Sequence, residues 1–183
     1  INECGFKRPM LVLEDTSWGR SNEHNMLAAL SDWGIIPLGV QWFNWNLGSV
    51  GAKMRLRRSF EAGADSILLV ANTPEGVVYV KEMAGVAEDK KIPIISHWGI
   101  TGGTFVDQVG SDVLSNVDLC FVQPNLAILH HPTSFAKEVF DRANELFGDD
   151  WCALARGPSP AGFLHGFDLT RLLIAAGEQA NLS

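Results

Sequence analysis

Apolar residues in the first two-thirds of the chain fall into short continuous runs, separated by segments of helical periodicity. The first run, Pro9–Glu14 (PMLVLE), has the length of a β-strand. In the segment Ser21–Gly34, apolar residues recur at helical spacing and a glycine closes the pattern. The later runs of strand length are Ile35–Phe43, Ser66–Ala71, Ile92–Ser96 and Asp118–Val122. This pattern predicts strands that alternate with helices.

The segments between the later strands carry helix signals of their own. Gly51–Gly63 has a helical pattern closed by glycine, and Thr73 is predicted to cap a helix whose first position is Pro74. Pro37 favours an edge position for the second strand, because proline cannot donate to a central ladder. Strands that are apolar throughout are covered on both faces. The pattern therefore predicts a three-layer, doubly wound α/β fold with a mostly parallel sheet.

The last third of the chain has a different pattern. Helices are predicted over His130–Gly148 and Phe163–Gln179, and the loop that joins them is rich in proline and glycine. Both helices carry apolar faces, and no predicted strand follows to receive them. The pattern therefore divides the chain into an α/β part over its first two-thirds and a segment of extra C-terminal helices over its last third.

Composition narrows the function classes. The 183 residues are 46% hydrophobic and 19% charged, which is typical of a globular domain rather than a disordered chain. The net charge of −7 argues against nucleic acid as a partner, because a surface that binds nucleic acid is basic. The basic cluster Lys53–Arg58 is most simply the solvated face of a helix. No apolar run approaches the ~20 residues of a membrane span.

Three of the turns that leave predicted strands combine polar groups with helix starts, and two of them also carry a tryptophan followed by glycine. They are DTSWGRS after the first strand, NTPEG after the third and SHWGITGG after the fourth. In an open parallel sheet, ligands bind outside the carboxyl ends of the strands, where these turns lie. The residues expected to bind a ligand are Ser17, Trp18, Asn72, Thr73, His97, Trp98 and Thr101.

These rings also have structural interpretations. Trp18 can pack over the first helix, and His97 can form hydrogen bonds within its own turn. Trp45 is either a contact at the rim of the site or part of a mobile loop. The residues predicted to serve in packing are Trp33, Trp42, Trp151 and Cys120, the last of them within the apolar run DLCFV.

Motifs for catalysis, phosphate binding and metal binding do not appear in the sequence. There is no GxSxG nucleophile elbow. The glycines of Gly48–Lys53 depart from the spacing of a phosphate-binding loop. The 5 histidines form neither an HxxH nor an HExxH pattern. We therefore expect no enzyme activity, no cofactor and no metal site.

Three segments, Met10–Leu30, Phe60–Met83 and Lys90–Ile100, together resemble the second lobe of type I periplasmic solute-binding proteins, in the branch of the branched-chain amino-acid receptors. That family has an aspartate-rich turn ending in Tyr-Gly, whose aromatic residue falls on Trp18. An AGAD junction corresponds to Ala62–Asp65. A late YDA helix start corresponds to Phe167, Asp168 and Leu169, and the residue before the family's Pro-Glu helix start falls on Thr73.

The resemblance implies one of two α/β lobes that are joined by a hinge and close on a small solute. A membrane permease of an ABC-type transporter then receives the solute, in the periplasm or outside the cell. Residues 1–122 would be the second lobe, and residues 123–183 would cross the hinge and pack on a first lobe. We therefore expect the chain to be an excised piece. Its last helices are expected to fold back on the sheet or to pair with a second copy in a homodimer.

The ligand class follows from a departure from the family pattern. Where the family often supplies an acidic group for the ammonium of an amino acid, this chain has His97 and Trp98. Together with Trp18, these rings suit a flat, aromatic or carboxylated solute, through stacking and charge-assisted hydrogen bonds. Two alternatives stay open. One is the ligand-sensing domain of a membrane receptor or hybrid kinase. The other is a flavodoxin-like or hydrolase-type α/β enzyme with a nucleophile or carboxylate pair at the strand ends.

Overall fold

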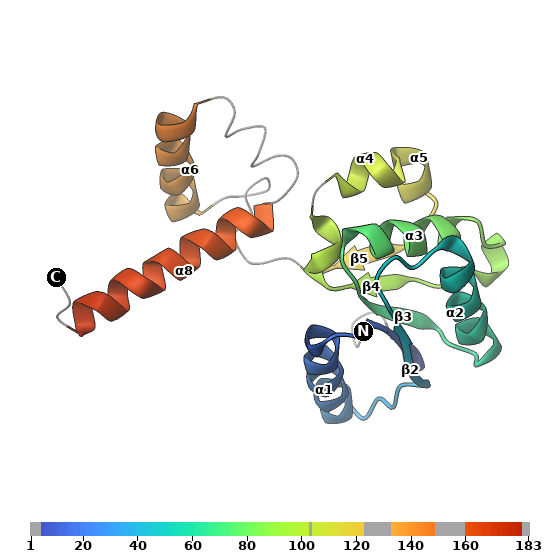
Figure 1. Ribbon diagram of the computed structural model, residues 1–183. Helices are drawn as coiled ribbons and strands as arrows, with labels where there is room; N and C mark the ends of the chain where they lie inside the picture. Colours follow the sequence, from blue (N-terminus) through green and yellow to red (C-terminus); the bar gives the residue numbers. More distant parts are fainter. Residues whose placement is uncertain (1–4, 103, 123–132, 149–159, 181–183) are drawn as a thin grey trace. The chain divides into compact units, whose positions relative to one another are not determined.

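The computed structural model describes residues 5–102, 104–122, 133–148 and 160–180, without the side chains of 160–162 and 164. The chain forms two compact units, one made of residues 1–100 and 105–122 and the other of residues 101–104 and 123–183. The first unit holds a parallel sheet of five strands in the order β2-β1-β3-β4-β5 (Figure 1). The strands are β1 (Pro9–Glu14), β2 (Gly39–Phe43), β3 (Ser66–Val70), β4 (Ile94–Ser96) and β5 (Leu119–Phe121).

Helices connect the strands and cover both faces of the sheet. They are α1 (Ser17–Asp32), α2 (Ser49–Glu61), α3 (Thr73–Ala84), α4 (Phe105–Val109) and α5 (Ser111–Leu114), with short 3₁₀ turns η1 (Glu88–Lys90) and η2 (Trp98–Thr101). In Figure 1, α1 lies on one side of the sheet and α2 with α3 on the other. The predicted doubly wound α/β fold with a parallel sheet is confirmed.

The alternation of side chains along β1 divides the core into two clusters. Leu11 and Leu13 pack with Leu30 of α1 on one face of the sheet. Met10 and Val12 belong to the larger cluster on the opposite face, which includes residues of α2 and α3. Each aliphatic side chain that is fully buried contributes about 1.5–3 kcal/mol. The core therefore holds β1 in the interior of the sheet and fixes its carboxyl end in place.

The strand order reverses beside β1. The chain passes from β1 outward to β2 and then returns past β1 to β3, so β1 has β2 on one side and β3 on the other. The helices that follow β1 and β3 lie on opposite faces and begin at the same edge. In doubly wound sheets such a topological switch point opens a crevice where ligands bind. In this fold, the turns after β1 and β3 are therefore where a ligand is expected to bind.

The starts of two helices differ from the sequence predictions. Helix α1 begins at Ser17 rather than Ser21, since the hydroxyl of Thr16 accepts a hydrogen bond of 3.2 Å from the backbone N–H of Gly19. The predicted N-cap role of Thr73 is wrong. Asn72 occupies the N-cap position of α3, and its side chain makes no capping bond there.

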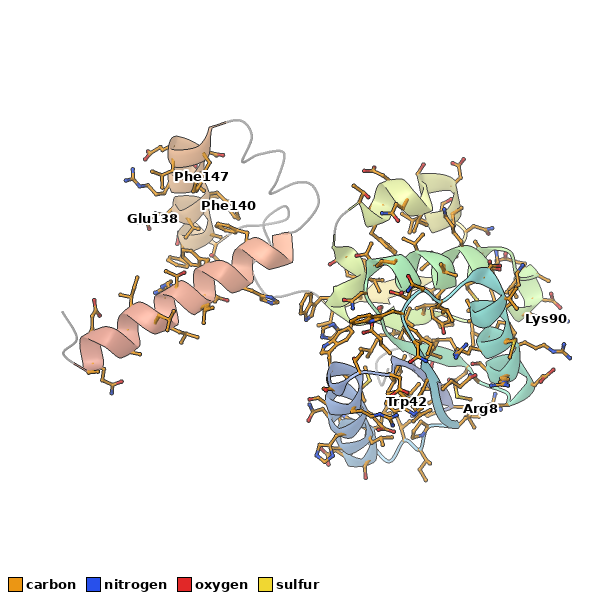
Figure 2. The ribbon with its side chains drawn as sticks, viewed as in Figure 1. Arg8, Trp42, Lys90, Glu138, Phe140 and Phe147 are labelled. Carbon is orange, nitrogen blue, oxygen red and sulfur yellow. The ribbon has the colours of Figure 1, made fainter. Side chains whose placement is uncertain are left out.

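Strand boundaries and burial also bring corrections. Strand β2 begins at Gly39 rather than Ile35, although it lies at the edge of the sheet as Pro37 predicts. Cys120 is exposed, contrary to prediction, because β5 is the outermost strand on its side. Trp33 is 64% exposed at the end of α1 and does not serve in packing. Trp42 packs beside α1 as predicted (Figure 2), and Trp151 lies outside the described residues.

The second unit contains two described helices, α6 (Ser134–Phe147) and α8 (Pro160–Gln179). Phe140 of α6 contacts Phe163 of α8, with ring centroids 6.2 Å apart (Figure 2). A cavity of about 300 Å³ lies between rings of the two helices. Large apolar side chains stay exposed along α8, namely Leu169, Leu172, Leu173 and Ile174. Within the described part of the chain, no helix is both long and apolar enough to cross a bilayer.

Candidate functional site

The turns that leave β1 and β4 meet at the carboxyl edge of the sheet. Trp18, in the first turn of α1, contacts His97, which directly follows β4. The two ring centroids lie 5.1 Å apart, with the ring planes at 78°. Strand β3 lies between β1 and β4 in the sheet. The two turns therefore reach toward each other across the end of β3.

The turn that leaves β3 joins the same group. A Cβ atom on Gly99 would lie 2.7 Å from the backbone oxygen of Ala71 and 3.1 Å from Cη2 of Trp18. The hydroxyl of Thr73 also lies 3.3 Å from the backbone oxygen of Ile100, to which it donates a hydrogen bond. Gly99 thus lets the turns after β1, β3 and β4 approach more closely than any larger residue would permit.

His97 is held in a defined orientation. Its Nδ1 accepts a hydrogen bond of 3.1 Å from the backbone N–H of Gly99, which requires an unprotonated nitrogen at that position. Its ring also contacts Trp98, with centroids 4.9 Å apart. Burial lowers the pKa of His97 below its ordinary value. The residue is therefore a neutral imidazole near pH 7, set between two indole rings.

Glu14 ends β1 at this edge, and only 2% of its surface is exposed. Its Oε1 accepts a hydrogen bond of 2.6 Å from the indole N–H of Trp45. Its Oε2 accepts one of 3.0 Å from the side-chain amide of Asn72. This carboxylate links the turns after β1, β2 and β3 across the switch point. Sequence analysis missed it, although a glutamate that closes an otherwise apolar run was a visible signal.

A second buried carboxylate supports the turn after β2. Glu75, in the first turn of α3, is 4% exposed. It accepts a hydrogen bond of 2.9 Å from the backbone N–H of Asn46. Asn46 has a φ of 62°, the only positive value outside glycine in the described part of the chain. Sequence analysis missed Glu75 as well, because an acidic residue in a first helical turn is common.

The structure brings most of the predicted binding residues together. Trp18, His97 and Trp98 are half-buried at the carboxyl edge, and Asn72 and Thr73 follow β3 there. Ser17 is exposed at the start of α1. Thr101 ends the turn η2 and is grouped with the second unit. The part these residues play in binding stays a prediction.

Apart from the buried carboxylate of Glu14, this edge offers aromatic rings and neutral hydrogen-bonding groups. Arg20, two residues after Trp18, forms an ion pair with Asp15, in which Nη2 and Oδ1 lie 2.7 Å apart. Its guanidinium carbon also lies 3.5 Å from the centre of the Trp42 ring. Among the residues that the structure describes, no group of three or more histidine, cysteine, aspartate or glutamate side chains could hold a metal ion. The arrangement suits stacking against a flat solute, with Asn72, Thr73 and His97 supplying polar contacts.

Comparisons with known proteins find similar folds among solute-binding proteins of known structure. No family model and no curated protein matches the sequence. One similar structure is a periplasmic binding protein type 1 from Bordetella pertussis Tohama I. The match covers 79% of this chain and 37% of that protein, with a TM-score of 0.66 and 17% sequence identity. Another is a leucine-binding protein from Thermotoga maritima. The match covers 97% of this chain and 46% of that protein, with a TM-score of 0.65 and 19% sequence identity.

A further similar structure is a solute-binding protein of an ABC transporter from R. palustris, in complex with 4-hydroxybenzoate. It covers 61% of this chain and 30% of its own, with a TM-score of 0.54 and 14% identity. The chain spans less than half the length of each of these proteins. It has the fold of one lobe of the type I periplasmic binding proteins, as the resemblance in the sequence predicted.

Proposed function

We propose that the chain is a lobe of a solute-binding component of an ABC-type uptake system. The lobe would bind a small solute at the carboxyl edge of its sheet, and closure against a partner lobe would enclose the solute. One observation carries the proposal: Trp18, Thr73 and His97 come from three different turns and meet beside the switch point. The likeness to binding proteins supports it at the level of the fold.

The ligand we propose is flat and aromatic, or carries a carboxylate. Aromatic pairs contribute about 0.5–1.5 kcal/mol beyond their buried area, and Trp18, His97 and Trp98 offer rings that are half-buried before any ligand arrives. The side-chain amide of Asn72 has two hydrogens, of which one is donated to Glu14, whereas the hydroxyl of Thr73 gives its hydrogen to the backbone oxygen of Ile100 and can act toward a ligand only as an acceptor. A ligand of this kind would reach the periplasmic or extracellular face and pass to a membrane permease.

The carboxylates of Glu14 and Glu75 fit a binding role better than an enzymatic role. An α/β enzyme at this edge would need a nucleophile or a carboxylate pair open to substrate. Glu14 and Glu75 are buried, and both accept hydrogen bonds from the turn after β2. Their engagement supports a non-enzymatic site in which these side chains hold the turns.

A thermal-unfolding screen of the 183-residue chain tests the proposal. The probes are 4-hydroxybenzoate, other aromatic acids, L-leucine and other amino acids. A ligand at 100 times its Kd stabilises the folded state by roughly 2.7 kcal/mol. We expect an aromatic acid to raise Tm, and Trp18→Ala to abolish that rise. Trp33→Ala, which removes an exposed ring at the far end of α1, is the matched control. A screen in which no probe raises Tm, or a rise that survives Trp18→Ala, contradicts the proposal.

A further inference from the structure

The turn between β2 and α2, residues 44–48, presents an indole ring that is both exposed and fixed. Trp45 is 66% exposed. Its N–H nevertheless donates a hydrogen bond of 2.6 Å to the buried carboxylate of Glu14. Hydrogen bonds to an ionised acceptor are about twice as strong as those between neutral groups. The ring is therefore held at one place on the surface and does not move freely as a loop side chain does.

A second carboxylate holds the backbone next to this ring. The N–H of Asn46 donates a 2.9 Å hydrogen bond to Oε1 of Glu75. Asn46 has a φ of 62°, a conformation that costs a residue other than glycine roughly 1–2 kcal/mol, although asparagine adopts it more readily than most. A turn in this conformation persists where surrounding contacts determine it. Glu75 supplies such a contact from the first turn of α3.

Burying these two carboxylates costs free energy of solvation, and the hydrogen bonds that they accept offset part of that cost. A buried charge needs hydrogen-bonding partners. In the described part of the chain, neither glutamate takes part in an ion pair, and the donors that reach them are neutral. Two donors, the indole of Trp45 and the N–H of Asn46, come from the same turn. The carboxylates thus hold this turn from β1 on one side and from α3 on the other.

The same carboxylate connects Trp45 to the candidate site. Glu14 pairs in register with Phe43 of the neighbouring strand, two residues before Trp45. Its other oxygen binds Asn72, one of the predicted ligand-binding residues. The exposed indole therefore stands at the carboxyl edge beside the turn after β3. This position is on the β2 side of the switch point, whereas Trp98 follows β4 on the other side.

We infer that Trp45 is a further ligand-contact residue, which adds an aromatic wall to the site on the β2 side, and that Glu14 and Glu75 are its positioning residues. This inference rests on the proposed function. It adds a specificity element for the same class of solute, because a ring fixed on each side of the crevice selects for ligands with a flat or apolar face.

Fluorine-19 NMR of the chain labelled with 5-fluorotryptophan tests the inference. Trp18→Phe, Trp45→Phe and Trp98→Phe each remove one resonance and so assign it. The first spectra are recorded without an added ligand. Glu14→Gln replaces a carboxylate that accepts two hydrogen bonds with an amide that carries a donor, which weakens the bond to the Trp45 indole. We therefore expect the Trp45 resonance to shift toward that of a freely solvated indole. Glu61→Gln is the matched control, because Glu61 is exposed at the opposite end of α2. An unchanged Trp45 resonance in Glu14→Gln overturns the positioning role.

The same sample is then titrated with 4-hydroxybenzoate and with L-leucine. The inference predicts that a probe that moves the Trp18 and Trp98 resonances also moves that of Trp45, and that Trp45→Ala weakens binding about tenfold, which is 1.4 kcal/mol. Movement of Trp18 and Trp98 without Trp45 overturns this inference and leaves the proposed function intact. If neither probe moves any of the three resonances, the proposed function and the contact role of Trp45 both fail. Glu75→Gln, read by the same Trp45 resonance, serves if Glu14→Gln does not fold.

Discussion

The ring of Trp18 meets that of His97 edge to face across the end of a strand to which neither belongs. The centroids are 5.1 Å apart and the planes stand at 78°. Trp18 follows β1 and His97 follows β4, with β3 between them. Gly99, two residues beyond His97, comes close to Ala71 after β3. The three turns are therefore held together before any ligand is present, which is the arrangement expected of a preformed site.

Replacing Gly99 with alanine should separate these turns. The new Cβ would lie 2.7 Å from the backbone oxygen of Ala71, and a backbone atom cannot rotate away as a flexible side chain can. We expect a loss of about 1–3 kcal/mol in the free energy of unfolding, the range for overpacked sites, measured by chemical denaturation. Gly48→Ala is the control, since a Cβ there meets open space. Equal stability of the two variants would show that the turns are not in close contact.

The stability of the fold should fall in mild acid because of His97. Burial lowers its pKa in the folded state, so as pH falls below the ordinary value of about 6.5 the unfolded chain takes up a proton first. The free energy of unfolding should therefore decrease from about pH 7.5 to about pH 5.5. Protonation of Nδ1 would also remove the acceptor for the N–H of Gly99.

Denaturation at a series of pH values checks this prediction. In His97→Gln the decrease should be smaller than in the parent chain. His24→Gln, at an exposed position of α1, is the control for the loss of a histidine side chain. An identical pH dependence in the parent chain and in His97→Gln would mean that this imidazole is not the group responsible.

Asp65 should stabilise the start of the sheet at neutral pH. Burial acts to raise the pKa of Asp65, but hydrogen bonds from the backbone N–H groups of Lys7 and Arg8, at 2.7 and 2.9 Å, and from the hydroxyl of Ser66 outweigh it and leave that pKa lowered. A lowered pKa means that the contribution is complete above the ordinary value of about 3.9 and is lost as pH falls through the folded-state pKa.

We expect Asp65→Asn to lower the free energy of unfolding by about 1 kcal/mol near neutral pH. It should also reduce the loss of stability below about pH 4. Asp107→Asn, at an exposed position of α4, is the control for removing a carboxylate. Calorimetry across the acid range makes the comparison, and the idea fails if Asp65→Asn and the parent chain lose stability in parallel.

The backbone at Asn46 should accept glycine and reject a β-branched residue. With φ at 62°, valine is disfavoured relative to glycine by roughly 1–2 kcal/mol. We expect Asn46→Gly to unfold at about the same denaturant concentration as the parent chain and Asn46→Val at a lower one. The pair Asn44→Gly and Asn44→Val is the control, because Asn44 does not have a positive φ. Equal stability of the two variants at position 46 would contradict the left-handed conformation.

The sequence predicts the sheet well because its strands are continuous apolar runs. The run Pro9–Glu14 coincides with β1, and Ser66 begins β3 as expected. Boundaries shift where one side-chain contact decides them: Thr16 starts α1 four residues earlier than the apolar spacing indicates. Apolar periodicity indicates which segments are buried, whereas the start of a helix depends on a single hydrogen bond at its cap. The strands are therefore predicted more accurately than the helix starts.

The site is predictable only in part. The meeting of Trp18 with His97 follows from the parallel sheet, since its carboxyl ends share an edge. The parts played by Glu14 and Glu75 do not follow, because a glutamate in a sequence gives no indication of which donors will reach it after folding. Cys120 shows the same limit for burial: its neighbours are apolar, yet β5 is the outermost strand and leaves it exposed.

Amide chemical-shift mapping tests most directly the claim that this edge binds a small solute. The nitrogen-15-labelled chain is titrated with 4-hydroxybenzoate and the shifted amides are placed on the structure. We predict that the largest shifts fall on the turns of Trp18, Thr73 and His97. Shifts confined to the opposite edge, at the polar cavity of about 410 Å³ beside Lys91 and Asp118, would contradict it.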